Sequence, residues 1–328
     1  MDSNKALEKK IPVLIITGFL GAGKTTFVNR LIRTHRHLKM ALVENEFGEV
    51  SIDTDLITGM RTEKIYDLSN GCICCSIFDE FSLTLIELAN SADNLDFLLI
   101  ETTGVADLSR VIRPFYAEEE LKARFSLQGS ICLVDALNFE EQLKGNEQQM
   151  QIILSDLLLV NKTNGVNPAV LDEIDRRLTA YNASSKIIHT SFSELADFSL
   201  ETFEENVHGQ LEQKLSGNFR FRITESKKYT TFTHRFYGEV NLDRFKYWFN
   251  YFAAINQLDV FRVKGILFPE GQPDKIVVQA VGGAVSYTEG SIIMPGEEPV
   301  NTIVFIGKSI DADRIADELQ RYLNEDAT

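Results

Sequence analysis

Basic residues are in short supply in this 328-residue sequence, where 33 Lys and Arg stand against 48 Asp and Glu, giving a formal net charge of -15. Proteins that bind the phosphate backbone of nucleic acid need clustered Lys and Arg, so we expect no nucleic-acid partner. Long apolar runs are also lacking: no segment has the length needed to span a bilayer, and residues 1–10 lack the apolar core of a signal peptide. We therefore expect a cytoplasmic protein with no membrane partner.

Cysteine is scarce, and its few copies are unevenly spread. Of the four cysteines, three fall at Cys72, Cys74 and Cys75, which is not the spacing of a disulfide framework in a secreted domain. In a reducing compartment such a cluster indicates metal or redox chemistry. A His-rich tract, another common metal-binding composition, is missing.

Buried-strand patterns recur along the first part of the chain. The continuous apolar run at residues 11–17 ends in glycine, as expected of a strand covered on both faces of a parallel sheet. Helical patterns separate most of the later runs, which lie at 40–43, 97–100, 131–134, 157–160 and 186–188. This alternation predicts an α/β domain over residues 1–195, with a mostly parallel sheet and helices on both faces.

The remainder of the chain has a different texture. Residues 196–218 are polar and acidic and are predicted to be a linker. Residues 219–328 are predicted to form a smaller α+β domain, because strand patterns there come before helical ones, which lie at 243–256 and 311–324. The first of these helices carries an aromatic stripe, which we interpret as core: Phe245, Trp248, Phe249 and Phe252.

A phosphate-binding loop is predicted at residues 18–25. The sequence Gly-Phe-Leu-Gly-Ala-Gly-Lys-Thr matches G-x-x-x-x-G-K-[ST] and lies between a strand pattern and a helix predicted from Lys24 to about Arg33. In such a loop backbone N–H groups face the phosphates, Lys24 reaches the β- and γ-phosphates, and the Thr25 hydroxyl ligates Mg²⁺. A chance glycine-rich turn is the alternative. The predicted nucleotide-binding residues of this segment are Gly18, Gly21, Ala22, Gly23, Lys24, Thr25 and Thr26.

An acidic residue at the end of a neighbouring strand should complete the magnesium site. Glu101 directly follows the run 97–100, so we assign it to Mg²⁺ and to catalysis together with Lys24 and Thr25. The segment from Glu101 to Gly104 resembles the D-x-x-G of GTPases with Glu for Asp, and Gly104 would present its N–H to the γ-phosphate. The alternative is a strand-end Glu that faces solvent. No water-orienting glutamine is apparent, which favours slow intrinsic hydrolysis.

Guanine recognition in GTPases uses N-K-x-D at the end of a late strand, and here Asn161 and Lys162 are followed by Asn164 in place of Asp. An amide has one acceptor and one donor group, so only one of the two guanine donors would be matched. Guanine preference could therefore be weakened, or shifted toward xanthine. The alternative is that Asn161 and Lys162 only open a turn toward Gly165.

The cysteine cluster lies at the entrance to a predicted helix, where the helix dipole favours thiolate, the form that binds metal. Cys72 and Cys74 can face one ion, whereas Cys75 either points elsewhere or joins after a local turn. Two or three sulfurs do not fill a tetrahedral zinc shell, so other ligands must contribute. Candidates come from the acidic loop after the second strand, where GTPases sense γ-phosphate: Glu44, Glu46 and Glu49. The alternatives for these three glutamates are that they neighbour Mg²⁺ or position water. Structural thiols, a redox dithiol and a solvated acidic loop remain alternatives.

Taken together and in this order, the segments 18–25, 44–49, 71–75, 101–104 and 161–162 resemble the CobW-like metallochaperone GTPases, most closely the shorter bacterial members without a His-rich insert. The resemblance implies a GTPase domain joined to a CobW-type C-terminal domain, slow GTP hydrolysis, and binding of zinc, cobalt or nickel for delivery to a client protein. It also implies that Cys72, Cys74 and Cys75 bind the metal, Cys74 foremost, with glutamates of the acidic loop.

Two other functions remain open at this point. The chain could be a nucleotide-regulated metal sensor or buffer without significant turnover. It could also be a small-molecule kinase that uses the same phosphate loop and a structural zinc. The client, the physiological metal and the oligomeric state, including a homo-oligomer, are not decided by the residues.

Overall fold

The computed structural model describes residues 10–45, 65–67, 77–91, 95–193, 198–204, 221–225, 229–308 and 310–324. The contacts between Cα atoms divide the chain into two compact units. The second unit comprises residues 152–156, 168–186 and 199–328, and the first comprises the rest. The second unit thus includes two segments that precede residue 195. No helix among the described residues is both long enough and apolar enough to cross a membrane.

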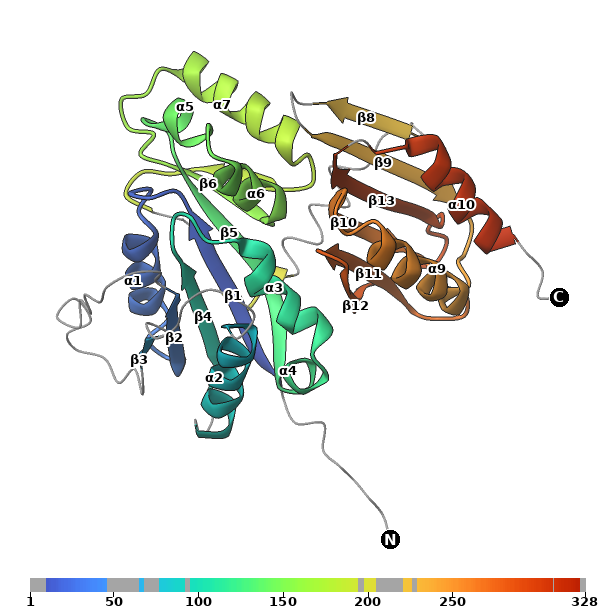
Figure 1. Cartoon of the computed structure of the whole chain (residues 1–328), viewed down its shortest axis with the longest axis horizontal. Coiled ribbons are helices and arrows are strands. Elements are labelled where there is room, and N and C mark those ends of the chain that lie inside the picture. Colours follow the sequence, from blue (N-terminus) through green and yellow to red (C-terminus); the bar gives the residue numbers. More distant parts are fainter. Residues whose placement is uncertain are drawn as a thin grey trace, which may run out of the picture. The chain divides into compact units, whose positions relative to one another are not determined.

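The first unit is built on a seven-stranded sheet with the order β3-β2-β4-β1-β5-β6-β7 (Figure 1). Neighbouring strands from β3 across to β6 pair in parallel. The strands are β1 (Ile11–Gly18), β2 (Met40–Asn45), β3 (Ile65–Asp67), β4 (Phe97–Thr102), β5 (Phe125–Asp135), β6 (Leu157–Asn161) and β7 (Lys186–His189). The predicted α/β fold class is confirmed.

Helices flank this sheet. Helix α1 packs against β1 and β4, α3 and α4 pack against β5, and α2 packs against α3 and α4. Burial on both faces explains why the central strands are continuously apolar: residues 13–16 in β1 and 98–100 in β4 are fully buried. The helices in the first 181 residues are α1 (Lys24–Thr34), α2 (Ile77–Ser91), α3 (Leu108–Ala117), α4 (Glu119–Arg124), α5 (Phe139–Gln142), α6 (Asn146–Leu154) and α7 (Pro168–Tyr181).

The second unit contains a six-stranded antiparallel sheet with the order β12-β11-β10-β13-β9-β8. Its strands are β8 (Phe221–Glu225), β9 (Thr230–Tyr237), β10 (Val260–Leu267), β11 (Asp274–Val281), β12 (Ala284–Ile292) and β13 (Val300–Gly307). Helix α9 (Leu242–Ile255) packs against α10 (Ala312–Asn324) and against β12. Strand β12 was not predicted from the sequence. It is an edge strand whose residues are mostly half-buried, and it therefore lacks a long apolar run.

Aromatic side chains form the core of the second unit. Trp248 stacks on Phe252 with ring centroids 5.1 Å apart, and Phe252 meets Phe305 edge to face at 5.6 Å. Phe245, Trp248, Phe249 and Phe252 are each at most 1% exposed. The interpretation of this stripe as core is confirmed. Large aromatic side chains spaced three and four residues apart on one helix face bury enough apolar area to hold α9 on the sheet.

Candidate nucleotide site

The loop between β1 and α1 depends on glycine at two positions. Gly18 has φ 132°, and a Cβ there would lie 2.2 Å from the carbonyl oxygen of Leu133. Gly23 has φ 100° and caps α1, and a Cβ there would lie 2.7 Å from Nδ2 of Asn161. Any other residue would be strained at both positions. The loop can therefore turn its backbone N–H groups toward an anion.

The side chain of Lys24 folds back onto this loop. Its Nζ donates hydrogen bonds to the carbonyl oxygens of Gly18, at 3.1 Å, and Phe19, at 3.2 Å. Helix α1 has no side-chain cap and no acidic residue in its first turn, so its leading N–H groups suit a phosphate. Of the other predicted residues, Gly21 has φ 74°, Ala22 is fully buried, and Thr26 is exposed on the first turn.

Thr25 and Glu101 meet beside the phosphate loop. The Thr25 hydroxyl donates to Oε1 of Glu101 at 2.9 Å, although the residues are far apart in the sequence. The parallel register of β2 and β4 sets Glu44 directly opposite Glu101, and paired parallel strands lie about 4.8 Å apart. A hydroxyl and a carboxylate at hydrogen-bonding distance are the oxygen ligands that Mg²⁺ prefers. These residues therefore fit a magnesium ion.

The segment after β4 abuts the phosphate loop. A Cβ on Gly104 would lie 2.6 Å from the backbone nitrogen of Leu20, so only glycine allows this approach. Gln151, which is fully buried, donates its amide to the carbonyl oxygens of Gly104 at 3.3 Å and Ala106 at 3.2 Å. Gln142 donates to the carbonyl oxygen of Leu20 at 3.1 Å. Neither glutamine was predicted from the sequence, because neither belongs to a recognised motif.

At the other end of the site, Asn161 joins β6 to the phosphate loop. Its Nδ2 donates to the carbonyl oxygen of Ala22 at 2.8 Å and to the Ser193 hydroxyl at 3.1 Å. Its Oδ1 accepts the backbone N–H of Ser193 at 3.0 Å. A residue that only opened a turn would not need these buried contacts. Ser193 was not predicted, because no sequence pattern marks it.

Lys162 makes an ion pair with Asp135, which was not predicted from the sequence. Its Nζ lies 2.8 Å from Oδ2 of Asp135, whose side chain is 1% exposed. Asp135 also accepts hydrogen bonds from the backbone N–H of Leu137 and the side chain of Asn138, each at 2.9 Å. Burial alone would raise the pKa of Asp135, but the hydrogen bonds from Lys162, Asn138 and Leu137 and the charge of Lys162 outweigh it and lower the pKa.

Asn164 lies on a loop that is held at its base. Thr163 donates both its backbone N–H, at 3.2 Å, and its hydroxyl, at 2.8 Å, to the carbonyl oxygen of Thr190. Asn164 itself is exposed, and within the described residues its side-chain amide makes no hydrogen bond. Lys162, Phe192 and Ser193 are the non-glycine residues with positive φ in the described part of the chain, and all three are at this end of the site.

The predicted transition-metal residues fall mostly outside the described residues. Cys72, Cys74, Cys75, Glu46 and Glu49 all do so, and Glu44 at the end of β2 is the exception. Within the described ranges no group of three or more His, Cys, Asp or Glu side chains is arranged to hold a metal ion. The metal site therefore stays a prediction. Cys132 lies buried in β5, as expected of a small apolar residue.

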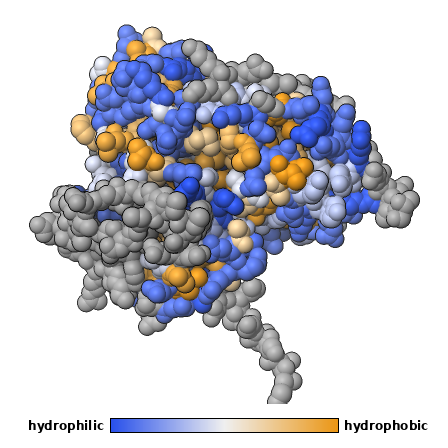
Figure 2. Space-filling view, viewed as in Figure 1, coloured by the Kyte–Doolittle hydropathy of each residue, from blue (hydrophilic) through white to orange (hydrophobic). Residues whose placement is uncertain are grey.

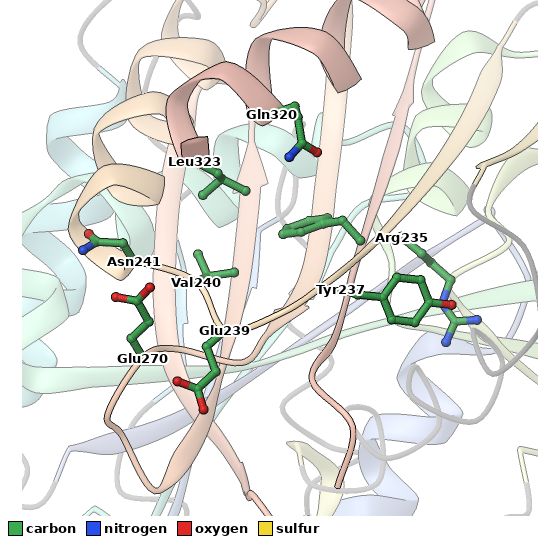
Figure 3. Close-up of a pocket in the computed structure, with 9 residues that line it drawn as sticks. Arg235, Tyr237, Glu239, Val240, Asn241, Glu270, Gln320 and Leu323 are labelled. Carbon is green, nitrogen blue, oxygen red and sulfur yellow. The ribbon is translucent and has the colours of Figure 1, made fainter. Parts of the chain in front are cut away.

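The second unit has a polar hollow of about 430 Å³ at the ends of β9 and α10. Glu239 and Glu270 lie on one side of it, and Arg235 and Tyr237 lie on the other (Figure 3). Elsewhere on the surface, apolar residues form small patches among polar ones on the face seen in Figure 2. The mixed charge of the hollow gives no indication of a particular ligand.

Comparison with known proteins gives two family matches in succession along the chain. Residues 12–189 match the CobW/HypB/UreG nucleotide-binding domain, and residues 229–323 match the C-terminal domain of the cobalamin synthesis protein cobW. The zinc chaperone YjiA of Escherichia coli is 32% identical over 312 residues, which cover 93% of this chain and 96% of YjiA. The zinc chaperone CobW of a Sinorhizobium species is 26% identical over 348 residues, covering 94% of this chain and 95% of CobW.

A solved structure is also similar over nearly the full length. The crystal structure of the Zn(II)-bound YjiA GTPase from E. coli has a TM-score of 0.66 at 25% identity, and the match covers 97% of this chain and 100% of that one. These matches confirm the resemblance inferred from the phosphate loop, the C-x-C-C cluster and the Asn-Lys pair. The chain belongs to the CobW/HypB/UreG family of nucleotide-binding proteins, in the group that carries a CobW C-terminal domain.

Proposed function

We propose that this chain hydrolyses GTP slowly and couples its nucleotide state to the binding of zinc, or of cobalt or nickel, for delivery to a client protein. Relatives that align along nearly the whole chain are named zinc chaperones. A shorter match, 31% identical over 206 residues, is the zinc-regulated GTPase metalloprotein activator 1 of Schizosaccharomyces pombe. The C-x-C-C cluster also suits a reducing compartment, so we expect the cytoplasm.

Each residue of the phosphate end has a distinct task in this proposal. Lys24 neutralises the β- and γ-phosphates, and Thr25 and Glu101 hold the magnesium ion. Magnesium, when bound, offsets the charge on the phosphate oxygens. Gly104 offers its backbone N–H to the γ-phosphate. We expect slow turnover because Gln142 and Gln151, the glutamines beside the loop, both donate their amides to backbone carbonyls.

The pairing of Glu44 with Glu101 is the observation that carries the coupling. Glu44 begins the acidic loop in which Glu46 and Glu49 are proposed to bind the transition metal with Cys72, Cys74 and Cys75. The strand that leads into this loop, β2, therefore runs beside β4, the strand that carries Glu101. A change at the γ-phosphate can shift Glu44 through the paired strands, and the metal-binding loop continues directly from it.

Zinc affinity in two nucleotide states tests this function. We would measure the zinc dissociation constant by competition with a chromophoric chelator, with GDP and with a non-hydrolysable GTP analogue. Cobalt–thiolate absorption provides a direct readout of cysteine ligation. Coupling energies are reciprocal, so zinc must change the affinity for the GTP analogue by the same factor. Equal zinc affinities in both states would refute the coupling, and Lys24→Ala should abolish any difference.

A further inference from the structure

We propose that the base end of the site reads the purine through Asn164, and that it accepts a xanthine nucleotide at least as well as a guanine nucleotide. This inference rests on the proposed function, because it requires a nucleotide bound at the phosphate loop. It concerns only which base that nucleotide carries. The chemistry of an amide facing the purine edge supports it, and so does the structure around Asn164.

The hydrogen-bond inventory of the base edge separates the purines. Guanine presents N1–H and an exocyclic amine, which are both donors, so a carboxylate matches it fully. An amide offers one oxygen acceptor and one NH₂ donor. Facing guanine, its NH₂ meets the exocyclic amine, and two donors oppose each other. Xanthine presents N1–H and a C2 carbonyl, so an amide matches both groups. Hypoxanthine, with N1–H and a plain C–H, falls between the two.

The loop that carries Asn164 is fixed at several points. Asn161 bonds to the phosphate loop at Ala22, and Thr163 bonds twice to Thr190. The backbone N–H of Val166 returns to the carbonyl oxygen of Thr163 at 3.1 Å and closes a turn around Asn164. A loop anchored in this way presents Asn164 at a set position. These contacts fix the backbone that carries the amide of Asn164.

Asp135 does not supply the missing carboxylate. It is 1% exposed and accepts hydrogen bonds from Lys162, Asn138 and the backbone of Leu137. Its two oxygens are thus already engaged with groups of the protein. In the N-K-x-D pattern the fourth residue faces the purine edge, and in this chain that residue is Asn164.

Two exposed apolar side chains adjoin the residues that hold the base end, and either can stack on any purine. Phe192 is 73% exposed and precedes Ser193 in the chain, and Leu137 is 64% exposed and donates its backbone N–H to Asp135. Phe192 also has φ 57°, and the next residue, Ser193, has φ 58° and bonds to Asn161. Bulky residues in this left-handed region are strained, and such strain gathers at ligand sites. Stacking on these side chains adds affinity without distinguishing guanine from xanthine.

Calorimetric titration of GDP and XDP, with magnesium present, tests the inference. For the wild-type chain we expect XDP to bind at least as tightly as GDP. Asn164→Asp should shift the ratio of the two dissociation constants toward GDP by about 5- to 150-fold, the factor that corresponds to one unmatched buried hydrogen-bonding group. Phe192→Ala is the matched control: it should weaken both nucleotides by the same factor and leave the ratio unchanged.

The outcomes separate this inference from the proposed function. A wild-type chain that binds GDP more tightly than XDP, or a ratio that Asn164→Asp does not move, overturns the reading by Asn164 and leaves GTP hydrolysis standing. Failure of the wild-type chain to bind either nucleotide overturns both. If Asn164→Asp does not fold, as judged by circular dichroism and thermal unfolding, the wild-type ratio alone decides.

Discussion

The two ends of the nucleotide site differ in the groups that build them: mainly backbone at the phosphate end, and side chains at the base end. At the phosphate end, Gly18, Gly23 and the start of α1 offer backbone groups, and the charged side chain of Lys24 is buried. At the base end, side chains make the contacts: Asn161 holds the phosphate loop, and Asp135 holds Lys162. Where the site is made of backbone, adding a side chain should therefore destabilise the fold more than removing one. Where the site is made of side chains, removing or changing a side chain should destabilise the fold.

The largest effect should come from adding a side chain at the phosphate end. In Gly18→Ala the new Cβ would lie 2.2 Å from the carbonyl oxygen of Leu133, which is backbone and cannot move aside. We expect a loss of about 3 kcal/mol or more in the free energy of unfolding, measured by urea denaturation. Gly21→Ala is the control, since nothing lies within 4 Å of its Cβ; it should lose only about 1 kcal/mol through its positive φ. Equal losses would contradict the comparison.

Removing a side chain at the same end should spare the fold and remove the ligand. Lys24→Ala should weaken GTP binding by about 100-fold, because a hydrogen bond to a charged group is lost. Its free energy of unfolding should fall by about 1 to 3 kcal/mol, less than in Gly18→Ala, because the ammonium donates to two loop carbonyls. Lys144→Ala removes an exposed lysine paired with Glu141 and should change neither quantity. A Lys24→Ala variant that unfolds would show that the lysine is structural.

At the base end, a conservative side-chain change should already cost stability, though less than Gly18→Ala. Asp135→Asn removes the charge that faces Lys162, and we expect a loss of about 1 to 3 kcal/mol at neutral pH. The exposed Asp172→Asn is the matched control and should cost about 0.5 kcal/mol or less.

The pH dependence of that loss checks its origin. The pKa of Asp135 in the folded state lies below its ordinary value of 3.8. The ionised carboxylate therefore stabilises the fold above that ordinary value, and this contribution disappears as the pH falls through the lower, folded value. Wild-type and Asp135→Asn stabilities should converge on acidification. A difference that stays constant down to strongly acidic pH would show that shape, rather than charge, causes the loss.

Sequence patterns predicted the strand and the helix on either side of the phosphate loop to within a residue. The loop is contiguous, and the strand and helix that flank it have their own periodicity, so the elements from β1 to α1 agree with the prediction. Glu101 could be predicted because it directly follows a run of buried apolar residues. Asp135 ends β5 in the same way and carries the same signal, but no GTPase motif drew attention to it. No sequence motif or periodic pattern marks Gln151 or Ser193.

The amino-acid sequence by itself determined the family, the parallel sheet, the aromatic core of the second unit and the place of Asn where an Asp is expected. These follow from local periodicity and from contiguous motifs, in which neighbours in the chain are neighbours in space. Only the tertiary structure decided that Thr25 meets Glu101, that Glu44 pairs with Glu101, and that Asn161 and Asp135 hold the base end. Those contacts join residues on different strands and loops, and strand order, which sets them, is not encoded in any one segment.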